Sequence, residues 1–263
     1  MKKNKQGYSL AEVLIALAIV GVVAALTIPS LVKNTADTSL GPSIGRAVQS
    51  VETGLANVFA LAQKRAADND THFTNSLSAL QVKNLFSGAE NEDDYLADGT
   101  LLFDMTQGIM GCKKIENNGY LNDIKEYSGN TKLSSTYNDL DNTVLIFNFE
   151  KKQALVMQMS ISGISEYLTN IGYKDVPQDV VIGRIFIDGN GKDAPNRLGH
   201  DVFLFGLTNS GHLVPAGSEA YNNNIFNETI PLYTEKCAGD NVQDARSCSA
   251  RLVNDDWKIK YNK

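Results

Sequence analysis

The stretch Gly7–Pro29, GYSLAEVLIALAIVGVVAALTIP, decides how the chain is built. Between Val13 and Ile28 the only polar side chain is Thr27, and the whole run approaches the roughly 20 residues that cross a bilayer as a helix. Glu12 interrupts the run near its start. A carboxylate is costly inside a bilayer, although less so one turn from the helix end. The stretch therefore predicts a retained membrane helix whose acid needs a partner.

The flanks of this run indicate its orientation. Lys2, Lys3 and Lys5 precede it, and positive flanks stay on the cytoplasmic side, so the rest of the chain is expected outside the cytoplasm. An ordinary secretory signal carries its small-residue cleavage site after the apolar core. Here the small residue, Gly7, comes before the core. An ordinary signal anchor with a chance glutamate is the alternative.

Composition narrows the class of protein. With 263 residues and 43% hydrophobic content, the chain can bury one substantial core or two small ones. The net charge of −6 and the lack of a basic stripe after Lys5 argue against a nucleic-acid partner. The three histidines, His72, His200 and His212, have no metal-binding spacing, and no nucleophile or phosphate-loop motif occurs. No catalytic residue is expected.

Five positions carry a resemblance to a known family. The basic leader ends at Gly7, Tyr8 supplies an aromatic residue next, Glu12 is fifth after that junction, and Gly21 and Pro29 follow at familiar places. This pattern resembles the type IV pilins and the pseudopilins of type II secretion. The resemblance implies cleavage between Gly7 and Tyr8, N-methylation of Tyr8, and pairing of Glu12 with the terminal amine of a neighbouring subunit.

The resemblance also implies an organisation and a role. Residues 1–7 would be a leader peptide, 8–37 the transmembrane and polymerisation helix, and 38–263 a periplasmic or extracellular globular domain. The chain would be a structural subunit, not an enzyme, and would require no cofactor. Its partners would be a prepilin peptidase, other pilin or pseudopilin subunits and a membrane assembly platform. It would leave the cytoplasmic membrane for a cell-surface or periplasmic filament, as a major or a minor subunit.

A second apolar pattern follows the membrane segment. Pro29 is expected to kink or loosen the first helix, and a helix is expected to restart at Gly41–Pro42, because proline suits a first turn. Apolar residues then recur at intervals of three and four, which predicts an amphipathic helix that ends near Ala67. The stripe consists of Leu40, Ile44, Val48, Val51, Leu55, Phe59 and Ala62.

The rest of the chain reads mainly as strands. Runs of β-branched and aromatic residues between turn signals predict six strands, with one short helix before them at 75–86. A helix followed by strands indicates an α+β domain with a mainly antiparallel sheet, a pilin-like fold in view of the resemblance. The predicted strands are 99–105, 143–149, 154–160, 180–187, 202–207 and 212–214.

Three cysteines, Cys112, Cys237 and Cys248, would face an oxidising compartment. Cys237 and Cys248 are the favoured disulfide pair, since they close a short polar loop whose bridging would contribute roughly 2–3 kcal/mol. Three free buried thiols are the alternative. In the same region Trp257 is expected to anchor a terminal strand in the core, with ligand stacking as the alternative.

One glycine-rich loop carries candidate metal ligands. Asp188, Asn190, Asp193 and Asp201 offer oxygen donors of the type that Ca²⁺ prefers. Some pilin-like proteins hold calcium in such turns, so these four residues are the predicted ligands. The alternative is ordinary turn chemistry, in which the side chains bond their own backbone.

Two other functions stay open at this point. One is a membrane-anchored extracytoplasmic enzyme, and the other is a calcium-dependent binding protein that uses the 188–201 loop. The binding protein is compatible with a pilin-like subunit, and the enzyme is required by no residue.

Overall fold

The computed structural model falls into two compact units, Met1–Ser39 and Leu40–Lys263. It describes residues 9–68, 109–115, 124–125, 131–133, 137, 143–149, 153–159, 166–167, 170, 177, 179–191, 193–233, 237 and 245–260.

The first element is one long helix, α1 (Leu10–Asp68). The predicted restart at Gly41–Pro42 is wrong, because the helix continues through both Pro29 and Pro42. A proline removes one backbone hydrogen bond and crowds the preceding turn. The long helical runs on both sides of each proline keep their remaining bonds, so each proline weakens the helix without ending it. The predicted end near Ala67 agrees with the structure.

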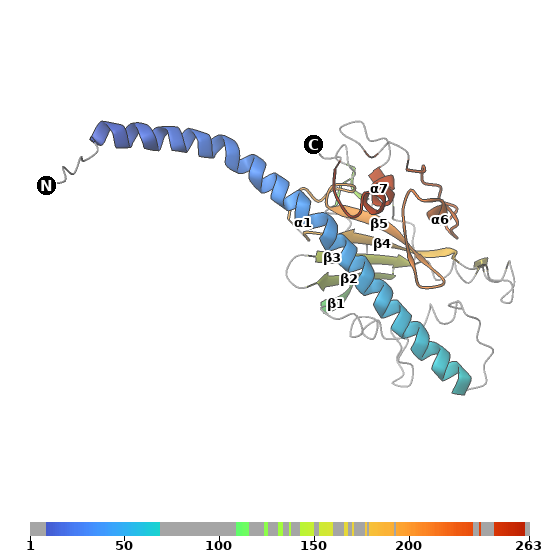
Figure 1. Cartoon of the computed structure of the whole chain (residues 1–263). Helices are drawn as coiled ribbons and strands as arrows, with labels where there is room; N and C mark the ends of the chain where they lie inside the picture. The colour runs from blue at the N-terminus through green and yellow to red at the C-terminus, as the bar shows by residue number, and fades with distance from the viewer. Residues whose placement is uncertain are drawn as a thin grey trace. The chain divides into compact units, whose positions relative to one another are not determined.

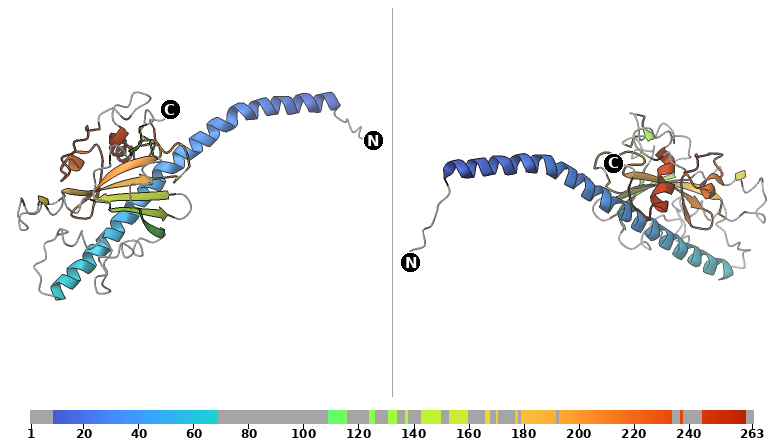
Figure 2. Two further views of the ribbon diagram at one scale, coloured as in Figure 1. Left: turned by 180° about the vertical axis from the view of Figure 1, so that it is seen from behind. Right: turned by 45° about the horizontal axis from the view of Figure 1, so that its top comes forward.

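In the second unit, α1 contributes one face to the core. Ile44, Ala47, Val48 and Val51 are almost fully buried, at intervals of three and four residues. The part of α1 drawn in lighter blue crosses the sheet in Figures 1 and 2, and the cyan end of the helix runs on past the strands. Leu55, Phe59 and Ala62 also belong to the predicted stripe, but their side chains lie outside the described residues.

The sheet is an antiparallel meander in which each strand pairs with the next along the chain. The mainly antiparallel α+β prediction is confirmed, and so are five of the predicted strands. The first described strand was not predicted, whereas the predicted strand 99–105 and helix 75–86 lie outside the described residues. The strands are β1 (Ile109–Ile115), β2 (Thr143–Phe149), β3 (Gln153–Met159), β4 (Val181–Asp188), β5 (Val202–Thr208) and β6 (Leu213–Pro215).

Strands β4 and β5 form the centre of the fold and are buried along their whole length. Successive side chains of a strand point to opposite faces, so both faces of this part of the sheet are covered. On one face Phe205 stacks against Trp257, with 6.4 Å between ring centroids. On the other face Arg184 lies next to the ring of Tyr137 and pairs with Glu228.

Short elements follow the sheet: α6 (Glu219–Asn222), the 3-10 turn η2 (Ala245–Ser247) and α7 (Cys248–Asn254). A disulfide joins Cys237 to Cys248, the pair that the sequence favours. The predicted terminal strand around Trp257 is absent from the described residues 255–260, which form a turn and an extended tail. Long helix, antiparallel sheet and short helices together make an α+β arrangement consistent with a pilin-like fold.

Candidate functional site

The start of α1 is built as a reciprocal cap. The Ser9 amide and the Ser9 hydroxyl both donate to Oε2 of Glu12, at 2.8 and 3.0 Å. In return the Glu12 amide donates to the Ser9 hydroxyl at 3.3 Å. This is the S-x-x-E capping box, in which two side chains satisfy backbone donors at the first turn of a helix. Glu12 therefore begins the helix as well as placing a charge on it.

Only one of the two carboxylate oxygens of Glu12 is used by the cap. Within the described part of the chain, Oε1 has no hydrogen-bond partner, and the residue is exposed. The N-terminal end of a helix carries a partial positive charge, which favours an acid in the first turn. The free oxygen can accept a donor from outside the helix while the cap stays closed.

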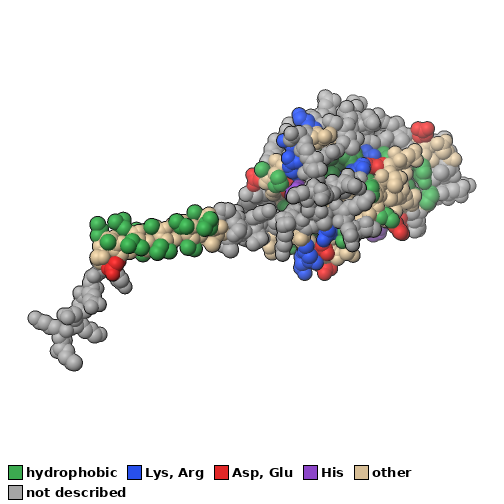
Figure 3. Space-filling view, turned by 90° about the horizontal axis from the view of Figure 1, so that it is seen from above, with side chains coloured by type: hydrophobic (Ala, Val, Ile, Leu, Met, Phe, Trp, Pro, Cys, Tyr) green, Lys and Arg blue, Asp and Glu red, His purple; other side chains and the backbone are tan. Residues whose placement is uncertain are grey.

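Behind Glu12, α1 presents apolar side chains on all sides. Leu10–Ile28 is a helix long and apolar enough to cross a membrane, by length and composition. Its side chains are exposed, for example Leu10 at 81% and Leu26 at 74%. Figure 3 shows this run of hydrophobic side chains with an acidic side chain near its start. So large an apolar surface needs lipid or other helices to cover it.

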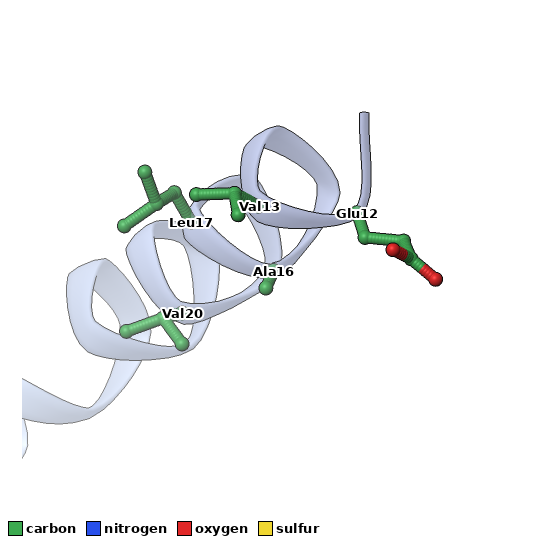
Figure 4. A pocket seen from close by; sticks show the side chains of 5 residues that line it. All are labelled: Glu12, Val13, Ala16, Leu17 and Val20. Carbon is green, nitrogen blue, oxygen red and sulfur yellow. The ribbon is translucent and has the colours of Figure 1, made fainter. Parts of the chain in front are cut away.

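A shallow apolar surface adjoins the cap. It is lined by Glu12, Val13, Ala16, Leu17 and Val20. In Figure 4 the carboxylate of Glu12 points away from the apolar side chains, beyond the start of the helix. The small side chain of Ala16 leaves the helix backbone accessible between larger residues, which suits close packing of a second helix in lipid.

Of the other residues predicted to act in processing and assembly, two lie within α1. Gly7 and Tyr8, the predicted cleavage and methylation positions, lie outside the described residues. Gly21 lies within α1, and nothing stands within 4 Å of a Cβ added there. Pro29 also lies within α1. Ser9 was not among the predicted site residues, although the spacing of Ser9 and Glu12 is itself the signal of a capping box.

Of the four predicted calcium ligands, Asp188 is the last residue of β4, and Asn190, Asp193 and Asp201 lie in the turn between β4 and β5. Asp201 is 1% exposed, and its two oxygens accept the amides of Asn196 and Arg197 at 2.8 and 2.7 Å. Asp188 is also buried, and it accepts the Asn190 amide at 3.1 Å. Burial raises the pKa of the Asp201 carboxyl, and the two backbone bonds oppose that shift. These are the bonds of a structural turn.

The fit of calcium to this turn is incomplete. Among the described residues, no three His, Cys, Asp or Glu side chains are grouped so that they could hold a metal ion. Asp188, Asp193 and Asp201 therefore do not form a ready ligand set, and Asp193 is exposed. A calcium ion would have to draw them together at the expense of the backbone bonds of Asp201. Calcium binding stays a prediction.

A partly buried charge cluster on the sheet was not predicted. Glu228 pairs with Arg184 at 2.8 Å and with Arg246 at 3.0 Å. The hydroxyls of Tyr137 and Tyr221 donate to the same carboxylate, at 3.5 and 3.3 Å. Burial, and next the charge of Glu228, raise the pKa of both tyrosines, so they stay protonated donors. The cluster ties Arg184 of β4 to α6, to η2 and to the segment between them, which is a structural role.

Comparison with known proteins adds one finding. Residues 2–28 match the family model "Prokaryotic N-terminal methylation motif", the signature of type IV pilins and pseudopilins. The match begins in the basic leader and ends at the last apolar residue before Pro29, so it includes the capped start of α1. Comparisons with curated proteins and with solved structures give no match.

Proposed function

We propose that this chain, which carries the prokaryotic N-terminal methylation motif, is a structural subunit of a type IV pilus or a type II secretion pseudopilus. It is inserted in the cytoplasmic membrane as a precursor, and a prepilin peptidase cleaves it between Gly7 and Tyr8. It then joins other subunits through the apolar part of α1. The observation that carries the proposal is the motif at residues 2–28.

The geometry of α1 supports assembly through this segment. In the bilayer, lipid covers the side chains of Leu10–Ile28, and in a filament the same helices of other subunits replace lipid. Cleavage before Tyr8 creates a charged amine at the very start of the helix. A neighbour's amine can then meet the open Oε1 of Glu12, while Oε2 keeps its bonds to Ser9. A buried acid is tolerated when such a base pairs with it.

The globular part would lie outside the cytoplasm, because Lys2, Lys3 and Lys5 hold the leader inside. There it would decorate the filament and set contacts with partners or surfaces. An oxidising compartment is consistent with the disulfide between Cys237 and Cys248. No residue requires an enzymatic role. The large globular part favours a minor or specialised subunit.

Intact mass spectrometry tests the proposal. The full chain is co-expressed with a prepilin peptidase and compared with a Gly7→Leu variant and with a peptidase-free control. We expect loss of residues 1–7 and gain of one methyl group on Tyr8, and neither change in the two controls. A chain that stays full length, or that is cut after the apolar run, would contradict the proposal.

A further inference from the structure

Two glycines of α1, Gly41 and Gly45, form a notch one helical turn long that is filled by Trp257. A Cβ added to Gly45 would lie 2.8 Å from Cδ2 of the indole ring, closer than real Cβ atoms approach. A Cβ added to Gly41 would overlap the main-chain carbonyl of Trp257. Gly21, in the same helix, has nothing within 4 Å of its added Cβ. The absence of side chains at positions 41 and 45 therefore has a local reason, which is to admit Trp257.

The indole ring of Trp257 also contacts the sheet. It stacks on Phe205 of β5, with 6.4 Å between centroids and 27° between ring planes. Phe205 is 1% exposed, so this contact reaches the centre of the core. One aromatic side chain thus lies between the helix and the sheet and touches both. Trp257 is half-buried, and its large ring adds apolar contact to both elements.

The backbone that presents Trp257 is strained. Asp256 and Trp257 are consecutive residues with positive φ, 54° and 58°. A bulky residue in the left-handed region is a genuine outlier, and it persists only where its surroundings over-determine it. The Trp257 amide donates to the Leu252 carbonyl at 2.9 Å, which stops α7 and turns the chain toward α1. The position of Trp257 in the notch of α1, its seat, is therefore kept in spite of an unfavourable backbone conformation.

Immediately before this turn, α7 is firmly fixed to the sheet. The Ala250 amide donates to the Ala216 carbonyl at 3.1 Å, and the Ser249 hydroxyl accepts the Leu204 amide at 2.9 Å. The disulfide to Cys237 holds the first residue of α7, and Arg251 donates to the Cys237 carbonyl at 2.8 Å. By contrast Lys258 and Lys260, which follow Trp257, are exposed. The chain is therefore fixed to the sheet along α7, and the strained backbone begins directly after that helix.

We propose that Asp255–Lys260, the C-terminal strap, is a clasp that holds the adjoining part of α1 on the sheet and opens without unfolding the sheet. Closed, the strap seats Trp257 between Gly45 and Phe205. Open, it relieves the strain at Asp256 and Trp257 and leaves α7 in place. The strap would thus add a releasable attachment to the permanent ones, which are the buried side chains of α1 and the bond from the Leu213 amide to Glu52. This proposal needs neither cleavage nor a filament, and so it stands apart from the proposed function.

The chain contains a single tryptophan, so its fluorescence reports the strap alone. We would compare full-length wild type, Gly45→Ala and Gly21→Ala in detergent micelles by acrylamide quenching. Both substitutions bring the same gain in helix propensity, so any difference between them comes from the seat of Trp257. We expect Gly45→Ala to increase the quenching of Trp257, and Gly21→Ala to match wild type.

Hydrogen exchange of the same samples separates opening of the strap from unfolding. In Gly45→Ala we expect residues 44–51 to lose protection while β5 keeps it. Adding Trp257→Leu to Gly45→Ala should restore protection at 44–51, because a smaller side chain fits the filled notch. Equal quenching in Gly45→Ala and Gly21→Ala would overturn the proposal. Simultaneous loss of protection in β5 would also overturn it, since helix and sheet would then open as one unit.

Discussion

Ser9 and Glu12 bond each other in both directions across the first turn of α1, with three hydrogen bonds between 2.8 and 3.3 Å. The acid that interrupts the apolar segment therefore has a local function before any assembly. It closes the start of the helix with one oxygen and leaves the other oxygen open. The two roles of Glu12, capping and pairing, can be separated by substitution.

Removal of the Ser9 side chain should loosen the helix start without touching the charge. In Ser9→Ala the Glu12 amide loses its acceptor, and the carboxylate loses one of its two donors. We expect faster amide exchange in the first turn of α1 in micelles. Thr27→Ala is the control, because Thr27 bonds the Val23 carbonyl within the same segment and caps no end. Equal exchange in the two variants would contradict the cap.

Glu12→Gln should have the opposite effect to Ser9→Ala, because it removes the charge and keeps the cap. The amide oxygen of glutamine can still accept from Ser9, so the helix start should keep its protection, while the charge that meets a neighbour's amine is gone. We expect most of the filament sheared from cells to be lost, and processing at Gly7 to continue. Filament yield by sedimentation and intact mass check the two parts. Undiminished filament would show that the charge of Glu12 is not needed for assembly.

The charge cluster around Glu228 predicts a stability effect. In Glu228→Gln, Arg184 and Arg246 lose the carboxylate that both of them pair with. Arg184 is buried, whereas Glu228 and Arg246 are partly exposed, so the cost should lie below the roughly 3–5 kcal/mol of a fully buried pair, and the thermal midpoint of the globular part should fall. Glu219→Gln, at an exposed position of α6, is the matched control and should change little. Calorimetry of both variants measures the difference.

Asp201 predicts a pH dependence of stability. Its folded-state pKa is raised above the ordinary value of 3.8 by burial. Between 3.8 and that higher folded value, the folded chain holds a proton that the unfolded chain has released. The contribution of Asp201 to stability is therefore full below 3.8 and is lost as pH rises through the folded pKa. In Asp201→Asn the melting temperature should therefore change less with pH between 3.8 and the folded pKa. An unchanged slope would assign the dependence to other groups.

Calcium binding has a direct test. If the 188–201 turn holds Ca²⁺, the melting temperature of the full chain should be higher in calcium than in chelator, because a ligand of the folded state stabilises it. Asp193→Asn should abolish the shift, since Asp193 is the exposed carboxylate of the predicted set. The Asp201→Asn variant is a poor probe here because Asp201 also holds the turn itself. An identical melting temperature in the two buffers would contradict calcium binding.

Most of the fold could be predicted because its elements have strong local patterns. The strands β2 to β6 are apolar runs between turn signals, and the buried face of α1 has a clear helical period. Strand β1, IMGCKKI, was missed because a glycine and two lysines hide its pattern. The seven residues of α7 cover only about two turns, which is too short for a helical period to stand out.

Some features of the candidate site could also be predicted from the sequence, and others could not. The membrane segment and Glu12 are contiguous in sequence, so their pattern was sufficient, and the cap of Ser9 was visible but overlooked. The cluster around Glu228 could not be predicted, because its partners at positions 137, 184 and 246 are brought together only by the folded chain. The notch for Trp257 likewise joins residues that are more than two hundred positions apart.

The seat of Trp257 on Gly41 and Gly45 has a consequence for biosynthesis. The helix is synthesised first, whereas Gly189 and Trp257, which lie against it, are synthesised late. The apolar side chains at positions 44 to 51 therefore wait through most of translation without these partners. Such exposed surface is prone to aggregate. The packing of this face of α1 can therefore be completed only after Trp257 has emerged.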